Sequence, residues 1–115
     1  LPLLGLFYPR RGNFITVIGD LAQMADVRQV KAAMRGGSAL PVHSFNGPRL
    51  VPGLDMSDHL NFWKAGYPAV MVTDTAFYRN PNYHSATDTP DTLDYPRMAQ
   101  VVQGVYAAVL TLTAQ

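Results

Sequence analysis

The stretch in which a strand pattern runs directly into a helix pattern constrains the fold most. Residues 14–18 are apolar and β-branched, as in a strand buried on both faces. Asp20 is placed to cap the helix that follows, and Gln23 is placed to complete a capping box. The glycine pair at 36–37 predicts the end of that helix. Apolar residues recur at helical spacing between these signals, at Leu21, Met24, Val27, Val30 and Met34.

The rest of the chain continues the alternation of strands and helices. Residues 40–45 contain a proline and predict a short edge strand, whereas residues 68–73 predict a second buried strand. Ser57 predicts the start of a short helix, and Pro96 opens a final helix that carries a wide apolar stripe. This alternation favours an α/β fold with two or three mostly parallel strands and flanking helices. The stripe consists of Met98, Val101, Val102, Val105, Tyr106, Val109 and Leu110.

The composition allows one domain at most, or a piece of a larger domain. The 115 residues are 48% hydrophobic, so the chain can build a core. Nine basic and eight acidic residues give a net charge of +1, which argues against nucleic acid as a partner. Every acidic residue is Asp, and Cys is absent. A catalytic Glu or a Cys-ligated metal therefore cannot come from this chain.

The opening residues 1–7 are apolar but do not have the pattern of a signal peptide, because no Met or basic segment precedes them. No apolar run is long enough to predict a membrane span. We expect the chain to be a part of a longer protein, and its own residues leave the localisation open.

The polar loop from Asp74 to Asp94 is the first candidate for a functional site. A loop of this length inside a compact domain is typically functional or disordered. It follows the predicted strand 68–73, and sites in open α/β sheets lie beyond the carboxyl ends of strands. His84 lies in this loop four residues before Asp88, a spacing that suits a metal ligand oriented by a carboxylate. The alternative is a surface histidine hydrogen-bonded within its own loop, with Asp88 as a turn residue.

Asp58 and His59, at the start of the short helix, are the second candidate. The strand 40–45 leads toward them, so they could converge with His84 at one rim of the sheet. The alternative is a helix cap followed by a carboxylate that the helix dipole favours. His43, within a strand pattern, is predicted to be structural. A serine triad is disfavoured because no Gly-x-Ser-x-Gly elbow is present.

Several short motifs follow one another in the second half of the chain. They are Ser57-Asp58-His59, Gly66-Tyr67-Pro68-Ala69, Thr73-Asp74-Thr75-Ala76, Arg79-Asn80-Pro81-Asn82-Tyr83-His84 and Asp88-Thr89-Pro90-Asp91-Thr92-Leu93-Asp94-Tyr95. This ordered series resembles the C-terminal part of bacterial di-zinc aminopeptidases, metallopeptidase family 28, whose relatives include the glutaminyl cyclases. The similarity extends from about Leu1 to the end of the chain and is densest between Ser57 and Arg97.

The resemblance implies specific roles for four residues. It assigns His84 as a ligand of one of two zinc ions and Tyr83 as a residue that holds the substrate or the tetrahedral intermediate. It implies that Asp58 and His59 line the site or support it from behind. The other ligands and a Glu that acts as general base come from earlier sequence in that family.

The resemblance also implies a fold and an activity. Residues 1–115 would form the C-terminal portion of a single zinc-peptidase catalytic domain, a partial three-layer fold within a larger mixed sheet. The parent would be a zinc-dependent aminopeptidase acting on peptide or protein N-termini, and a periplasmic or secreted location is favoured. The alternatives are a glutaminyl cyclase-like acyltransferase and a non-catalytic assembly module. The 115-residue chain by itself is expected to be inactive and to self-associate.

Overall fold

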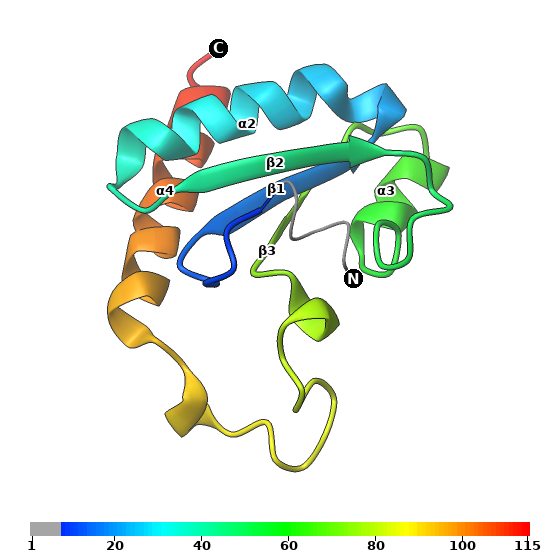
Figure 1. Cartoon of the computed structure of the whole chain (residues 1–115). Coiled ribbons are helices and arrows are strands. Elements are labelled where there is room, and N and C mark those ends of the chain that lie inside the picture. The colour runs from blue at the N-terminus through cyan, green and yellow to red at the C-terminus, as the bar shows by residue number, and fades with distance from the viewer. Residues whose placement is uncertain (1–7) are drawn as a thin grey trace.

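The computed structural model describes residues 8–115, so the apolar opening 1–7 lies outside the described residues. Three strands form one mixed sheet: β1 (Ile15–Asp20), β2 (Val42–Gly47) and β3 (Met71–Thr73). Their order is β2-β1-β3 (Figure 1). The predicted α/β class is confirmed, with β1 in the centre and β2 at an edge.

The direction of β3 corrects the expectation of mostly parallel strands. Only β1 and β2 are parallel, whereas β3 is antiparallel to β1. A parallel β3 would need a crossover that returns the chain to the far end of the sheet. The connection after β2 instead holds the short helix α3 (His59–Lys64) beside the carboxyl end of β2 (Figure 1). The chain therefore re-enters the sheet from that end.

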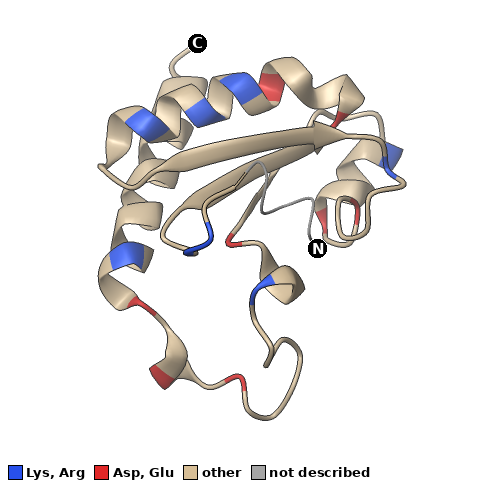
Figure 2. Ribbon diagram, viewed as in Figure 1, with Lys and Arg blue, Asp and Glu red and all other residues tan. Residues whose placement is uncertain are grey.

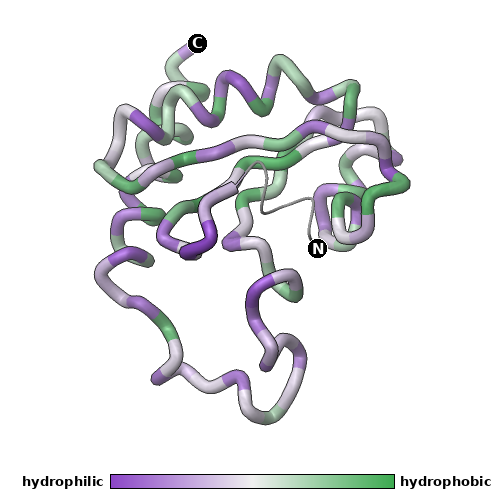
Figure 3. Tube along the Cα trace, in the orientation of Figure 1, coloured by the Kyte–Doolittle hydropathy of each residue, from purple (hydrophilic) through white to green (hydrophobic). Residues whose placement is uncertain are grey.

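Two helices, α2 (Met24–Gly37) and α4 (Tyr95–Thr113), pack on one face of the sheet and against each other. All six residues of β1 are buried, and Figure 3 shows that the long loop beyond β3 is mostly hydrophilic. The core between sheet and helices consists of Ile15, Val17, Val27, Met34, Leu40, Val42 and Ala108. None of the helices in residues 8–115 is long and apolar enough to cross a membrane.

The helix ends confirm some of the predicted signals and correct others. The Asp20 carboxylate accepts a hydrogen bond from the Ala22 amide, 3.0 Å away, and so caps the short 3-10 helix η1 (Leu21–Gln23) that leads into α2. Gln23 does not complete a capping box, because its side-chain oxygen accepts from the Ala69 amide instead. No side-chain cap hydrogen bond is made at the start of α3, where the cap residue is Asp58 rather than Ser57.

The predicted stripe on α4 is only partly buried. Small residues make the closest contact with α2: Gly104 and Ala108 are buried, and Val101 is half-buried. Most of the stripe faces away from the sheet, and Val102 and Tyr106 are 63% and 64% exposed. The structure thus leaves most of the apolar stripe of α4 exposed.

Candidate functional site

The long loop begins in strained backbone immediately after β3. Thr75 and Ala76 have positive φ angles of 82° and 45°, a conformation that costs free energy in residues with a side chain and is common at functional sites. Two local hydrogen bonds hold this bend. The Thr75 amide donates to the Thr73 hydroxyl at 3.1 Å, and the Ala76 amide donates to the Asp74 carboxylate at 3.0 Å. The bend leads into the 3-10 helix η2 (Ala76–Tyr78).

Tyr83 and His84 are presented together on the outer part of this loop. Their rings are stacked with centroids 3.9 Å apart and planes at 16°. His84 also has a positive φ, 54°, and both side chains are exposed. The Tyr83 ring centroid lies 5.8 Å from that of Phe77 in η2. An aromatic series therefore connects His84, through Tyr83, to the end of β3.

Asp88 lies in the same loop but contacts Asn80. The Asn80 side-chain amide donates to the Asp88 carboxylate at 3.3 Å, whereas no hydrogen bond joins Asp88 to His84 in the described part of the chain. The role of Asp88 in orienting His84 stays a prediction.

His59 and Asp58 lie apart from His84, so the convergence expected from the sequence is not seen. Figure 1 shows α3 and the loop of His84 separated from each other. His59 is 6% exposed, its ring meets Trp63 edge-on at 4.7 Å, and its Nε2 donates to the Leu54 carbonyl at 2.6 Å. Asp58 is exposed. The site-lining role of both residues stays a prediction.

His59 is nevertheless connected to the loop of His84 through the segment 51–54. The Tyr78 hydroxyl donates to the Pro52 carbonyl. The Phe77 ring lies so close to Gly53, which has a φ of 90°, that a side chain there would collide with it. His59 therefore holds one side of the segment while Phe77 and Tyr78 hold the other.

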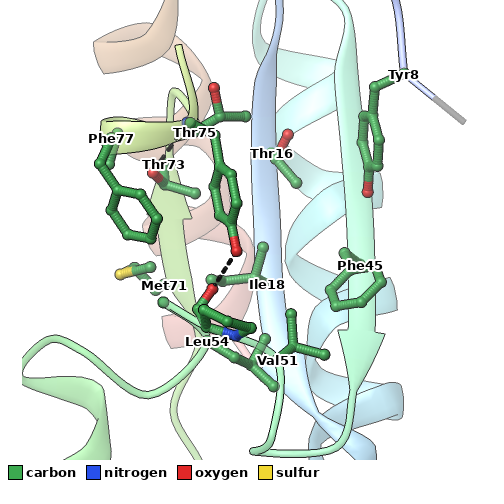
Figure 4. Close-up of a pocket in the computed structure, with 14 residues that line it drawn as sticks. Tyr8, Thr16, Ile18, Phe45, Val51, Leu54, Met71, Thr73, Thr75 and Phe77 are labelled. Carbon is green, nitrogen blue, oxygen red and sulfur yellow. Dashed lines mark hydrogen bonds between the residues drawn. The ribbon is translucent and has the colours of Figure 1, made fainter. Parts of the chain in front are cut away.

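An apolar pocket of about 90 Å³ lies on the sheet face opposite the helices. Figure 4 shows this face, with α2 and α4 behind the sheet. Two buried hydroxyls in its wall, those of Thr16 and Thr75, have no hydrogen-bond partner in the described residues. Phe77 belongs both to this pocket and to the aromatic series that leads to His84. The sheet supplies Thr16, Ile18, Phe45, Met71 and Thr73.

This pocket was not predicted from the sequence, although the alternation of side chains along β1 and β3 could have indicated it. Residues two apart on a strand face the same side of a sheet. Thr16 and Ile18 therefore share one face, and Met71 and Thr73 share the matching face of the neighbouring strand. What the sequence did not show is that this face lacks a helix.

His43 is held by packing, as predicted. Its ring meets that of Phe14 edge-on at 4.8 Å and that of Tyr8 at 5.7 Å. Burial, followed by the positive charges of Lys31 and Arg35, holds the pKa of His43 below its ordinary value. Figure 2 shows that basic residues predominate on the α2 helix that carries these charges.

A complete metal site is not present within residues 8–115, where no three His or Asp side chains gather around one point. His84 suits the part of a single ligand, because its ring is exposed and makes no hydrogen bond to another described residue. A zinc site needs at least three protein ligands. The remaining ligands would therefore have to come from other residues than those described.

The fold and this site define an α/β unit that presents a histidine-bearing loop beside an apolar pocket. The family model described as Peptidase family M28 matches residues 10–109. The chain therefore belongs to peptidase family M28, as its motifs predicted.

Two kinds of relative are similar to the chain. It is 53% identical over 104 residues to the uncharacterized protein YfbL of Escherichia coli strain K12, covering 90% of this chain and 32% of that protein. It is 45% identical over 49 residues to probable leucine aminopeptidases of Arthroderma otae and Trichophyton verrucosum, covering 42% of this chain and 13% of each of those proteins. The chain thus spans about a third, or less, of the length of these relatives. No solved structure matches it.

Proposed function

We propose that the chain is the C-terminal portion, residues 1–115, of the catalytic domain of a zinc-dependent aminopeptidase. The observation that carries the proposal is the exposed Tyr83–His84 pair, in which His84 has a left-handed backbone and the Tyr83 ring lies against Phe77 just beyond β3. Membership of family M28 and the similarity to probable leucine aminopeptidases support it.

The partial three-layer fold proposed for the longer protein is supported by what the sheet lacks here. One face carries α2 and α4, whereas the other is covered by loop segments and forms the pocket. Within residues 8–115, β3 pairs only with β1, so its second edge could extend a larger mixed sheet. A sheet of only three strands is consistent with a portion of a larger domain. The match of this chain to 32% of the length of YfbL is consistent with the same proposal.

In this proposal His84 would hold one of two zinc ions through a ring nitrogen, and other ligands would come from outside the chain. Zinc, when bound, lowers the pKa of a bound water and polarises a peptide carbonyl. The Tyr83 hydroxyl would donate a hydrogen bond to the oxygen of the tetrahedral intermediate. Asp58, His59 and Asp88 would support these groups from behind.

The Tyr83 hydroxyl provides the sharpest test, because Tyr83→Phe removes one oxygen and keeps the ring that stacks on His84. In the longer protein with bound zinc, we expect turnover of aminoacyl chromogenic substrates to fall by a factor on the order of 10² to 10³. The KM should change little, because the lost bond forms only in the transition state. Tyr106→Phe, at an exposed position on α4, is the matched control and should leave both constants unchanged.

Product analysis with two kinds of substrate separates the proposed activity from the two alternative functions. A glutaminyl cyclase-like enzyme would release ammonia from peptides that begin with Gln and leave the peptide bond intact. A non-catalytic assembly module would turn over neither substrate. Rapid zinc-dependent hydrolysis by the 115-residue chain itself, free of contaminating peptidase, would contradict the proposal that this chain is only a portion of the catalytic unit.

A further inference from the structure

The loop that presents Tyr83 and His84 makes most of its side-chain hydrogen bonds with itself. The Asn80 side-chain oxygen Oδ1 accepts from the Asn82 main-chain amide at 2.9 Å. The Thr87 hydroxyl donates to the Asn82 side chain at 2.8 Å, and the Ser85 hydroxyl donates to the Asn82 main-chain carbonyl at 2.6 Å. Such bonds fix the shape of the loop, but they do not fix its position on the sheet.

Arg79 connects this loop to a distant part of the chain. Its Nη1 donates to the Arg10 carbonyl at 2.9 Å, and its Nη2 donates to the Pro9 carbonyl at 2.8 Å. Within residues 8–115, these are the only side-chain hydrogen bonds that link residues 79–88 to the rest of the molecule. The partners lie 69 and 70 residues away in sequence.

The surroundings of Arg79 suit a guanidinium group in particular. Its Cζ lies 5.0 Å from the centroid of the Phe14 ring, which is 4% exposed and precedes β1. A planar fork can donate to two carbonyls and rest on an aromatic face at the same time, whereas an ammonium offers a single nitrogen. No carboxylate forms a salt bridge with Arg79 among the described residues. The positive charge of Arg79 therefore interacts with the carbonyls of Pro9 and Arg10 and with the Phe14 ring.

We propose that Arg79 is a positioning residue that fixes the loop of Tyr83 and His84 to the bend 9–13 and to Phe14. Arg79 is five residues before His84, so the fork sets the starting point of the segment that carries the aromatic pair. When a functional group is held in position in advance, it loses no conformational entropy at the moment it acts. The proposal rests on the proposed function only in that the catalytic roles of Tyr83 and His84, which the loop carries, come from it.

The test uses the 115-residue chain, without metal or substrate, and measures amide-nitrogen relaxation. In Arg79→Ala we expect the order parameters of residues 80–88 to fall from about 0.85 toward 0.6 or below, while those of β1 stay unchanged. Arg79→Lys should give intermediate values. Added methylguanidinium should restore part of the order in Arg79→Ala but have no effect on the wild type. Arg11→Ala, which removes an exposed arginine from the same bend, should behave as the wild type.

Two outcomes would overturn the positioning role. Unchanged order parameters in Arg79→Ala would show that the loop is held by other contacts. A parallel loss of order in β1, without rescue by methylguanidinium, would show that Arg79 only supports the fold as a whole. Because no zinc is needed, a failed zinc or peptidase assay would leave this result standing, and a failure here would leave the proposed activity untouched.

Discussion

Two glycines at the contact between α2 and α4 should respond to alanine in opposite directions. A Cβ at Gly37 would lie 2.6 Å from the Ala107 Cβ and 2.9 Å from the Gln103 carbonyl oxygen, far inside normal contact distances. A Cβ at Gly104 would instead meet Met34 at 3.4 Å or more, which is ordinary packing. Both positions are helical with negative φ. Steric fit alone should therefore decide the sign.

The expected magnitudes follow from these contacts. Gly104→Ala gains helix propensity without a collision, so we expect the free energy of unfolding to rise by about 0.5–1 kcal/mol. Gly37→Ala forces the two helices apart, and overpacking of this kind costs roughly 1–3 kcal/mol. For a domain of this size, the melting temperature should rise by ~2–5 °C for Gly104→Ala and fall by ~4–15 °C for Gly37→Ala.

Thermal and urea unfolding of both variants, followed by circular dichroism, give the comparison. The concentration of protein must be the same in every sample, because association shifts the melting temperature. If Gly37→Ala were as stable as the wild type, the close approach of α2 and α4 would be refuted. If Gly104→Ala were strongly destabilised, the space beside Met34 would be refuted.

Three further predictions concern charge, association and pH. Lys31→Gln should raise the pKa of His43, because a nearby positive charge is lost, whereas Arg28→Gln should leave it unchanged; imidazole proton titration by NMR measures both. The chain should sediment as dimers or larger species that Val102→Lys with Tyr106→Lys converts to monomer, and a wild-type monomer at high concentration would contradict this. The Arg97 amide and side chain lower the pKa of Asp94, so this carboxylate stabilises the fold above its unfolded pKa and the effect is lost as pH falls. Between neutral pH and about pH 3, the melting temperature of Asp94→Asn should therefore fall by less than that of the wild type.

The elements with strong local signals could be predicted from the sequence. The apolar run 14–18 and the cap at Asp20 indicated β1 and the start of the helical segment, and both are observed. Pro96 similarly marked α4, which begins at Tyr95. In each case the signal lies within a few residues of the element it determines, so no knowledge of the tertiary structure was needed.

Elements that depend on distant partners were predicted less well. The strand expected at 68–73 begins only at Met71, because the backbone groups of Ala69 are hydrogen-bonded to side chains. The Trp63 indole donates to its carbonyl at 2.9 Å, and its amide donates to Gln23. The helix ends at Gly37, as the glycine pair predicted, although the φ of Gly37 is not positive. Its lack of a side chain instead allows α4 to approach α2.

The candidate site, like the fold, could be predicted from the sequence only in part. The family motifs indicated Tyr83 and His84, but not the stacking of their rings or the left-handed backbone of His84. Arg79 lies within one of these motifs, but its partners are main-chain carbonyls far away in sequence, which leave no pattern of residue types. The free face of the sheet was equally hidden, because an apolar residue has the same identity whether it lines a pocket or a core.

Zinc content, measured together with turnover, tests whether His84 is a ligand of a catalytic metal. In the longer protein, His84→Ala should lose zinc relative to the wild type and lose most of its activity, while its circular dichroism spectrum stays that of the wild type, because an exposed loop residue fills no core. His43→Ala is the matched control: it removes a histidine packed against Phe14 and should retain the wild-type zinc content even if its stability falls. Wild-type zinc stoichiometry in His84→Ala would contradict the assignment of His84 as a ligand.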